Sequence, residues 1–385
     1  MTDTVKTRRP DVQHPLAGQA VPGAQAVVQV LADEGAEAIF GYSGGAILPT
    51  YDAIFTFNEQ QKRSGGRQLP LIVPANEQGA GFMAAGYARS SGRVGVCMVT
   101  SGPGATNTVT PVRDCMADSV PIVVICGQVG RSAIGTDAFQ EAPVASLMSA
   151  VAKHVFLVTE PAKLEATVRT AFEVARTGRP GPVVVDLPKD VQTAAVVFRG
   201  EGRLPIPGYR ARLAELTAST LGDAAAGDFL QLLAESRRPL IYAGGGVING
   251  AAAPALAELV HALGIPVVTT LMGIGAIDTT DPLAMRMLGM HGAAYANYAV
   301  EDCDFLLAVG ARFDDRVAGD PRKFARHARR IAHMDIDPAE INKVKSAHWS
   351  YVGPMAEALR ALTAYARRSG FTADFSRWRA ELSEL

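Results

Sequence analysis

Short apolar runs that alternate with longer helical patterns constrain the fold of this chain more than any other feature. The runs "VGVCMV", "PIVVIC" and "PVVVDLP" are apolar at nearly every position rather than at every second one. Strands of this kind are buried on both faces, which is typical of parallel sheets covered by helices on both sides. Helical patterns such as "LEATVRTAFEVART" and "APALAELVHALG" lie between the runs. We therefore predict an α/β protein with doubly wound parallel sheets.

The chain divides at a stretch without clear periodicity. Its 385 residues are enough for two or three domains. Residues 196–215 contain Pro205, Pro207 and Gly208, which is typical of a linker. We expect a disordered tail at 1–19, a first domain at 20–195 and a second at 210–360. Residues 361–385 are expected to form a linker toward a third domain that the chain does not contain.

Composition excludes some classes of partner. Charged residues make up 19% of the chain and the net charge is −1, so the basic excess typical of nucleic-acid binding is absent. No apolar run has the length of a membrane span or the form of a signal peptide. The four cysteines show no C-x-x-C pairing, and a buried free thiol is the expected state for Cys97 and Cys126. A cytoplasmic location is expected, with neither nucleic acid nor membrane as a partner.

Glycine-rich and polar turns follow many of the strand-like runs. Examples are "GYSGGA", "TSGPGATN", "AGGGVING" and "VGARFDDR". Open parallel sheets bind ligands beyond the carboxyl ends of their strands, so these turns are candidate binding loops. Each turn taken alone is equally compatible with a purely structural role. Arg312 and Arg316 fit a phosphate or a flavin edge, but also an exposed charge cluster; His291 has no neighbours at metal-ligand spacing.

Residues 76–89, "NEQGAGFMAAGYAR", place one acid before a run of small residues. Helix starts favour negative charge, so Glu77 is expected at the N-terminus of a helix. Glycine and alanine give that helix almost no side-chain bulk, and another group can therefore approach it closely. Glu77 would meet that group first, which makes it a candidate functional acid.

Eight motifs occur together in one order: "GYSGGAILPTYDAI", "NEQGAGFMAAGYAR", "VTSGPGATNTVTP", "GQVGRSAIGTDAFQEA", "GRPGPVVVDLPKDV", "LGMHG", "VGARFDDRV" and "DIDPAEINK". With these motifs the chain closely resembles the large catalytic subunit of acetolactate synthase (acetohydroxyacid synthase), a thiamine-diphosphate enzyme of valine, leucine and isoleucine biosynthesis. The resemblance covers the chain from residue 20 to its end.

The resemblance implies a reaction and assigns roles to residues. Glu77 would hydrogen-bond the thiamine aminopyrimidine and promote deprotonation of the thiazolium ring; pyruvate would be decarboxylated, and the bound enamine would condense with a second 2-oxo acid. Glu77 and Gln128 are the expected catalytic residues, and Phe139 is expected on the substrate side. The residues expected to bind cofactors are Tyr42, Gly44, Glu77, Pro103 and Asn107 in the first domain and Gly244, Gly245, Gly246, Asn249, Thr270, Leu271, Gly289, Met290, His291, Gly310, Arg312, Arg316 and Asp335 in the second.

The implied cofactors are thiamine diphosphate, FAD and Mg²⁺. FAD is expected in the second domain, without net redox change in the main reaction. The Mg²⁺ ligands are expected on the third domain, because the family's G-D-G…N motif does not occur here; no metal ligand is expected in this chain. Other departures are Asn76 and Ser43, where the family usually has His and Pro, Ser149 near the position of an FAD-contacting Arg, and Met272 at a position often occupied by Gln.

Two hypotheses about function follow from the resemblance. In the first, the chain is an incomplete acetolactate synthase that acts on small 2-oxo acids and requires a separate C-terminal-domain chain. In the second, it is a non-catalytic truncated homologue that binds flavin or associates with other subunits. The resemblance also implies a homodimer that forms through the first domain, and it leaves a regulatory small subunit open.

Overall fold

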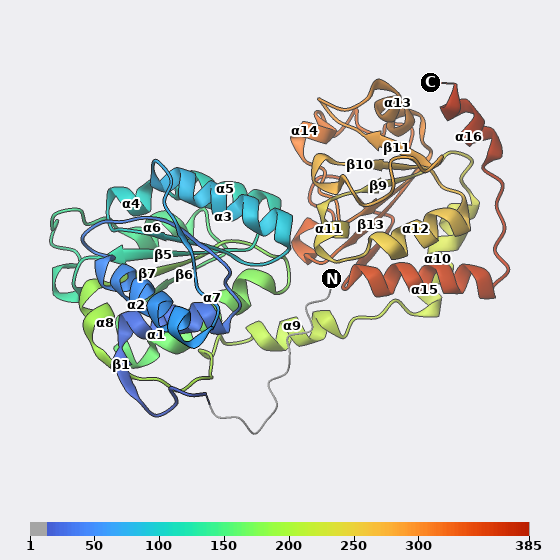
Figure 1. Ribbon diagram of the computed structural model, residues 1–385. Helices are drawn as coiled ribbons and strands as arrows, with labels where there is room; N and C mark the ends of the chain where they lie inside the picture. Colours follow the sequence, from blue (N-terminus) through green and yellow to red (C-terminus); the bar gives the residue numbers. More distant parts are fainter. Residues whose placement is uncertain (1–13, 385) are drawn as a thin grey trace. The chain divides into compact units, whose positions relative to one another are not determined.

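In this computed structural model, residues 14–384 are described, and they form two compact units divided between Pro207 and Gly208. We call residues 14–207 the N-terminal unit and residues 208–384 the C-terminal unit. Each is built on a parallel sheet with helices on both faces (Figure 1). The predicted α/β class with two doubly wound domains is therefore confirmed. Residues 1–13, most of the expected disordered tail, lie outside the described residues.

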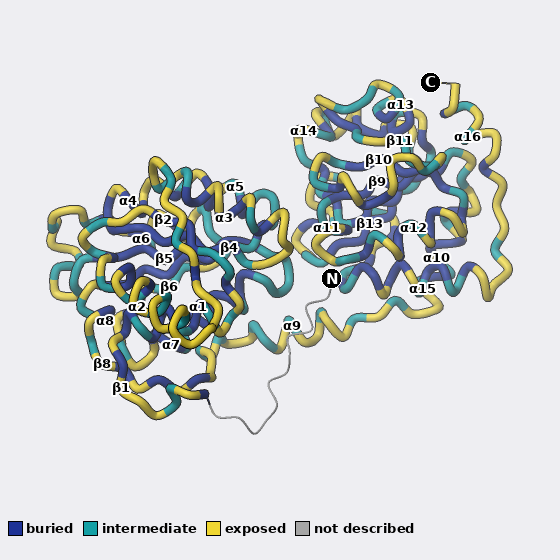
Figure 2. The backbone as a smooth tube through the Cα atoms, viewed as in Figure 1, coloured by how far each residue is buried: buried dark blue, intermediate teal, exposed yellow. Residues whose placement is uncertain are grey.

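The main sheet of the N-terminal unit has the order β3-β2-β4-β5-β7-β6, and every pairing is parallel. The strands are β2 (Ile39–Tyr42), β3 (Leu71–Ile72), β4 (Gly95–Val99), β5 (Ile122–Gln128), β6 (His154–Leu157) and β7 (Val183–Pro188). All residues of β4, β5 and β7 are buried, as their continuous apolar sequence predicts (Figure 2).

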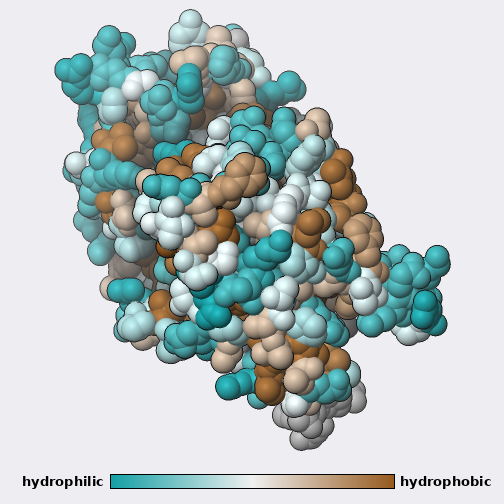
Figure 3. Space-filling view, turned by 90° about the vertical axis from the view of Figure 1, so that its left-hand side faces the viewer, coloured by the Kyte–Doolittle hydropathy of each residue, from teal (hydrophilic) through white to brown (hydrophobic). Residues whose placement is uncertain are grey.

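Helices cover both faces of this sheet. Their bounds are α1 (Gly23–Asp33), α2 (Leu48–Ser64), α3 (Glu77–Ser91), α4 (Pro103–Thr106), α5 (Val109–Asp118), α6 (Val144–Ser149), α7 (Leu164–Arg176) and α8 (Lys189–Thr193), with 3-10 turns η1 (Arg131–Ala133) and η2 (Pro161–Lys163). Helices α3, α5 and α6 share one apolar core with β4 and β5, while α1 and α7 pack together on the other face. Figure 3 views the side of this unit at the left of Figure 1, where hydrophobic residues stand in small groups among polar ones.

Segments expected as tail and linker are part of the N-terminal unit. Strands β1 (Ala20–Pro22) and β8 (Ala195–Val197) pair antiparallel. His14 is buried, with its Nε2 3.3 Å from Asp33, so residues 14–19 are packed rather than free. The backbone N–H groups of Arg199 and Gly200 donate to the Glu165 carboxylate of α7 at 2.7 and 2.9 Å. The first domain therefore continues beyond residue 195.

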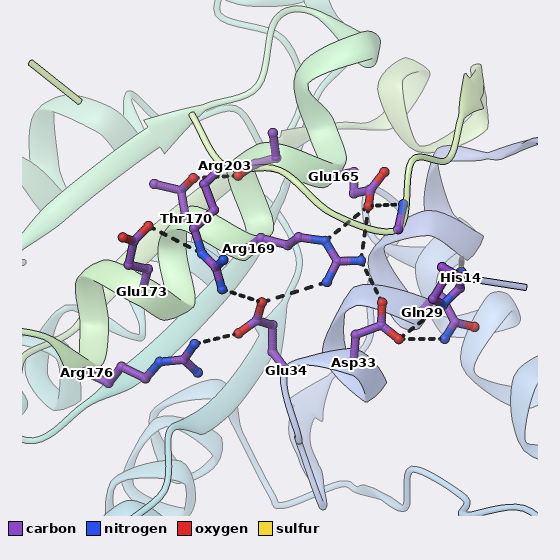
Figure 4. Close-up of polar contacts among 12 residues, drawn as sticks. His14, Gln29, Asp33, Glu34, Glu165, Arg169, Thr170, Glu173, Arg176 and Arg203 are labelled. Atoms are coloured by element: carbon purple, nitrogen blue, oxygen red, sulfur yellow. Dashed lines mark hydrogen bonds and ion pairs between the residues drawn. The ribbon is translucent and has the colours of Figure 1, made fainter. Parts of the chain in front are cut away.

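A buried charge cluster joins α1 to α7 (Figure 4). Arg169 is 5% exposed, and its guanidinium donates to Asp33 at 2.6 Å and to Glu165 at 3.1 Å. Glu34 lies 3.8 Å from the same guanidinium and also pairs with Arg176 at 2.9 Å. Several paired charges inside a helix interface compensate one another, so the cluster fixes these two helices relative to each other.

The C-terminal unit has the sheet order β11-β10-β9-β12-β13-β14, again with parallel pairing throughout. Its strands are β9 (Pro239–Ala243), β10 (Val267–Thr269), β11 (Ala284–Met287), β12 (Phe305–Val309), β13 (Arg330–Asp335) and β14 (Trp349–Val352). Its helices are α9 (Tyr209–Thr217), α10 (Asp223–Ala234), α11 (Gly245–Asn249), α12 (Ala253–Leu263), α13 (Ala294–Asp302), α14 (Asp315–Ala318), α15 (Met355–Arg368) and α16 (Ser376–Ser383), with η3 (Leu271–Gly273) and η4 (Pro338–Glu340).

The expectation that residues 361–385 form a linker is wrong. Helix α15 packs with α10 and α12 on one face of the sheet, and α16 covers the other face beside α13. Trp378 of α16 is 3% exposed, and its indole N–H donates to the Pro239 carbonyl at 3.0 Å. The tertiary contact of one aromatic residue therefore makes this polar, amphipathic segment part of the domain.

Within residues 14–384, no helix combines the length and apolar character needed to cross a membrane.

Candidate functional site

The sheet of the N-terminal unit has its topological switch point between β2 and β4. From β2 the chain moves outward to β3, whereas from β4 it moves the opposite way through β5 and β7. Such a point leaves an opening at the carboxyl edge of the two strands. The turns after β2 and β4 meet there: the Ala46 N–H donates to Thr100 Oγ1 at 3.3 Å. A Cβ at Gly44 would lie only 2.5 Å from Thr100 Cγ2, so this approach requires glycine.

Glu77 stands at the same edge. It is the first residue of α3, and the Asn76 side chain caps the helix by accepting from the Gly79 N–H at 2.8 Å. The Asn107 amide donates to Glu77 Oε2 at 2.8 Å, which joins α3 to the turn after β4. The Glu77 side chain is partly exposed, so its carboxylate is accessible in this unit. Glu77 and Asn107, both expected to bind the thiamine cofactor, thus lie in direct contact.

The remaining first-domain candidates border the same opening. Tyr42 ends β2 and is 39% exposed, and Pro103 begins the short helix α4 between Gly102 and Asn107. Behind the opening the core is apolar: burial raises the pKa of the Tyr51 phenol, and the Glu77 carboxylate raises it further. Thr100 and Tyr51 were not predicted. Thr100 follows a buried strand directly, and that polar residue after an apolar run was the available signal.

The small residues of α3 do not face the opening, contrary to the interpretation of that segment. Ala80, Ala84 and Ala88 are buried against the sheet, and a Cβ at Gly81 would collide with Pro111 of α5. Phe82 and Met83 are 41% and 43% exposed. The lack of side-chain bulk therefore lets α3 pack closely on its own sheet and on α5, rather than admitting a flat ring.

Gln128 precedes a loop that follows β5, residues 129–142, and Phe139 lies within that loop. Gln128 is 2% exposed, and its amide donates to the Ala142 carbonyl at 3.1 Å and to Asp186 Oδ2 at 3.2 Å. Phe139 is 87% exposed at the far end of the loop. The two residues expected near substrate therefore occupy opposite environments, one inside the fold and one in solvent.

The C-terminal unit has an equivalent switch point between β9 and β12. Glycines after the two strands touch through their backbones: the Gly246 N–H donates to the Gly310 carbonyl at 2.9 Å. Gly310 has a φ of +55°, and a Cβ there would lie 2.7 Å from Gly246 Cα. Gly244 is also in contact with Gly310, so the three glycines let the turns after β9 and β12 pack backbone against backbone at the sheet edge. Their N–H groups donate within the fold, to the carbonyls of Val309, Gly310 and Met334.

Several predicted flavin-binding residues lie around this edge. The Met290 N–H donates to the Arg316 carbonyl at 2.9 Å, which joins the turn containing Gly289 to α14. Tyr242 donates to the Arg312 carbonyl at 2.7 Å. Leu271 and Met290 are 68% and 64% exposed, so two apolar side chains are accessible at this edge. Four other residues predicted to bind the flavin have these places: Gly245 lies beside Met272, Asn249 and His291 are exposed, and Thr270 caps η3.

Asp335 differs from the rest of that set. It ends β13, is 7% exposed, and accepts from the Asp337 N–H at 2.9 Å through Oδ1. Its Oδ2 lies 3.9 Å from Nε2 of the buried His333. The carboxylate is therefore turned into its own loop.

No group of His, Cys, Asp and Glu within residues 14–384 has a geometry that could hold a metal ion.

Asp186 is a further buried acid, which motif reasoning did not single out. It lies in β7 at 2% exposure, and burial raises its pKa to about 7, although the hydrogen bond from Gln128 opposes the rise. The signal in the sequence was an acid inside the apolar run "VVVDLP". Its partner Gln128 connects it with the loop 129–142.

Comparison with known proteins matches both units. Residues 21–149 match the model of the thiamine pyrophosphate enzyme N-terminal TPP binding domain, and residues 227–362 match that of the thiamine pyrophosphate enzyme central domain. Acetolactate synthase 3, chloroplastic, from Brassica napus is 44% identical over 365 residues, which are 94% of this chain and 53% of the relative. The acetolactate synthase large subunit of Corynebacterium glutamicum is 44% identical over 363 residues, 94% of this chain and 55% of the relative. The chain thus spans about half the length of the curated relatives it matches.

Proposed function

Because this chain belongs to the thiamine pyrophosphate enzymes, whose N-terminal and central domains it contains, we propose that it is a catalytic chain of acetolactate synthase. In this proposal it decarboxylates pyruvate and joins the remaining two-carbon unit to a second 2-oxo acid, for valine, leucine and isoleucine biosynthesis. The observation that carries the proposal is Glu77 at the switch point of the N-terminal sheet, hydrogen-bonded to Asn107.

The residues at this edge fit the aminopyrimidine of thiamine diphosphate. Glu77 offers a carboxylate to a ring nitrogen, and Asn107 holds that carboxylate in place from the turn after β4. Gly44 lets the turn after β2 approach Thr100 closely, which brings the turns after β2 and β4 together beside Glu77. Thiamine diphosphate supplies the carbanion chemistry when it is bound. The chain's part is to hold the proton that Glu77 shares with the ring and to fix the ring's orientation.

The edge of the C-terminal unit fits FAD in the same way. The contact of Gly246 with Gly310 brings the turns after β9 and β12 together at the edge where the cofactor is proposed to lie, and Leu271 and Met290 offer apolar cover for a flavin. Arg312 and Arg316 add positive charge to that edge. Mg²⁺ is proposed to be held by the family's diphosphate-binding domain rather than by these two units.

A homodimer through the N-terminal unit is part of the proposal. Exposed apolar residues lie on α3 and in the segment that precedes it; they are Ile72, Val73, Phe82 and Met83. A surface of this kind is typical of protein–protein contacts. Sedimentation velocity at micromolar concentration is expected to show a dimer, which Phe82→Asp would dissociate. A wild-type monomer would contradict this part of the proposal.

We also propose a cytoplasmic location, since four buried free cysteines suit a reducing compartment.

The experiment that tests the proposal measures acetolactate formed from pyruvate with thiamine diphosphate, FAD and Mg²⁺. The chain is assayed alone and after mixing with a diphosphate-binding domain taken from the C. glutamicum relative. Glu77→Gln is expected to lower the rate about 100-fold or more, because the general acid–base group is lost. Glu160→Gln, which changes an exposed carboxylate just before η2, serves as the control. Equal rates for Glu77→Gln and wild type would refute the role of Glu77.

A non-catalytic truncated homologue that binds flavin or associates with other subunits remains the second candidate function, because Asn76 and Ser149 depart from the family's usual residues. Its signature is distinct: visible flavin absorbance in the purified chain, with no acetolactate formed in either mixture. The same samples therefore separate the two functions.

A further inference from the structure

The Gln128 side chain closes the loop 129–142 at both of its ends. Its Oε1 accepts from the Val129 N–H at 2.9 Å, at the start of the loop. Its Nε2 donates to the Ala142 carbonyl at 3.1 Å, at the end of the loop. One amide therefore holds the two ends of a fourteen-residue segment, which runs from 129 to 142, against the sheet edge.

Asp186 holds that amide from the neighbouring strand. Its Oδ2 accepts from Gln128 Nε2 at 3.2 Å, and its Oδ1 has no hydrogen-bond partner among the described residues. The surroundings are apolar: Cys126, its register partner on β5, and Val184 on β7 are fully buried. An acid with one unpaired oxygen in such a core costs free energy that a leucine of similar volume would not. Packing therefore does not account for this carboxyl, whereas its contact with Gln128 does.

The rest of the loop is organised around its own contacts. The Glu141 carboxylate accepts from the N–H groups of Gly135 and Ala138. Arg131 donates to Asp190 at 2.7 Å. These contacts shape the loop internally and fix its first turn. At its end, Ala142 packs into the apolar core and its carbonyl accepts from the Gln128 amide, three residues after the exposed Phe139.

We propose that Asp186 is a positioning residue, which orients the Gln128 amide so that this amide closes the loop 129–142 and sets the place of Phe139. The burial of the carboxyl agrees with this role, because a nearly neutral pKa lets Asp186 stay in an apolar core while it accepts a hydrogen bond. That the place of Phe139 matters for substrate binding rests on the proposed function, whereas the closure of the loop by Gln128 and Asp186 does not.

The test compares three variants by amide hydrogen exchange on the full chain without cofactor or substrate. Asp186→Leu removes the acceptor and keeps an apolar volume. Asp186→Asn keeps an oxygen that can accept from Gln128. Cys126→Ala is the matched control. It disturbs the same buried core, but it leaves the hydrogen bonds of the Gln128 amide to Val129, Ala142 and Asp186 in place.

Exchange in residues 129–142 is expected to become about tenfold faster in Asp186→Leu, because the loop loses a hydrogen bond that keeps it closed. The buried strands β5 and β7 should exchange as in wild type. Asp186→Asn should restore the loop to within about threefold of wild type. In Cys126→Ala any faster exchange should include the strands and not single out the loop.

Two results would overturn the proposal. One is a loop that exchanges as slowly in Asp186→Leu as in wild type, and the other is an Asp186→Asn chain as open as Asp186→Leu. If Asp186→Leu fails to fold, Gln128→Met removes the amide from the other side and should open the same loop. A protected loop in folded Gln128→Met would then refute the proposal. None of these measurements involves thiamine, so their failure is distinct from failure of the proposed function.

Discussion

Replacing Arg169 with methionine is expected to lower the free energy of unfolding of the N-terminal unit by about 3 kcal/mol. Methionine keeps much of the buried length of arginine but removes the charge. Arg169 is 5% exposed and pairs with Asp33 at 2.6 Å and Glu165 at 3.0 Å, both nearly buried (Figure 4). Removing one partner from buried ion pairs leaves uncompensated charge, which costs roughly 3–5 kcal/mol.

The lower end of that range follows from the partners that remain. Glu34 keeps Arg176 and Arg203, at 2.9 and 3.1 Å. Glu165 keeps the two backbone N–H groups that it accepts from, and Asp33 keeps Gln29 at 3.0 Å. Each remaining hydrogen bond to a carboxylate reduces the charge left unsatisfied. Asp33 and Glu165 lose the most, because the shortest contacts of the guanidinium are with them.

The assay separates the two units. Both tryptophans, Trp349 and Trp378, lie in the C-terminal unit, so tryptophan fluorescence reports on that unit, while far-ultraviolet circular dichroism reports on both. For a unit of this size, 3 kcal/mol corresponds to a midpoint lower by about 6–12 °C. Lys163→Met is the control, because Lys163 and its partner Glu160 are more than half exposed and their pair contributes less than about 1 kcal/mol. A loss below about 1 kcal/mol in Arg169→Met, or equal losses in both variants, would refute the reasoning.

Other predictions concern Asp186 and the glycine contact of the C-terminal unit. Because the folded pKa of Asp186 is about 7, above the ordinary value of 3.8, the stability linked to its protonation is complete below pH 4 and is lost as the pH rises through 7. Asp186→Asn should abolish a slope of up to about 1.4 kcal/mol per pH unit, measured as the difference between the denaturation profiles of wild type and variant. Gly310→Ala should destabilise the C-terminal unit by about 2 kcal/mol or more and abolish flavin absorbance, because its Cβ would lie 2.7 Å from Gly246 Cα at a φ of +55°. Urea denaturation followed by tryptophan fluorescence measures that loss, and Gly222→Ala, where a Cβ meets open space, should cost less than about 1 kcal/mol.

The sheets and their ligand edges were predictable because they depend on local sequence. Continuous apolar runs require two covered faces, and glycines directly after such runs fall at the carboxyl ends of parallel strands. The turns that contain Gly44 and Gly310 were expected at strand ends for that reason, and the structure places each turn at a switch point. The cofactor-binding roles of the two glycines came from the resemblance. Glu77 was predicted at the start of a helix, and its place as the first residue of α3 confirms that position.

Other features depend on contacts between distant segments. The small residues of α3 indicated a close neighbour, but composition did not say that the neighbours were the sheet and Pro111 rather than a ligand. The docking of α16 depends on a hydrogen bond from the indole of Trp378 to the carbonyl of Pro239, the first residue of β9, which lies 139 residues earlier in the chain. The role of Gln128 in closing a loop depends on Asp186 in a strand that follows much later.

The four cysteines of the chain are all buried, and burial raises the pKa of the thiols of Cys97, Cys115, Cys126 and Cys303. Thiolate is the reactive form, so the folded chain is expected to react slowly with maleimides and disulfide reagents. A cysteine introduced at Phe139 would then be the one fast-labelling position on the molecule. A dye or spin label placed there would report the motion of the loop directly, without removal of any native cysteine.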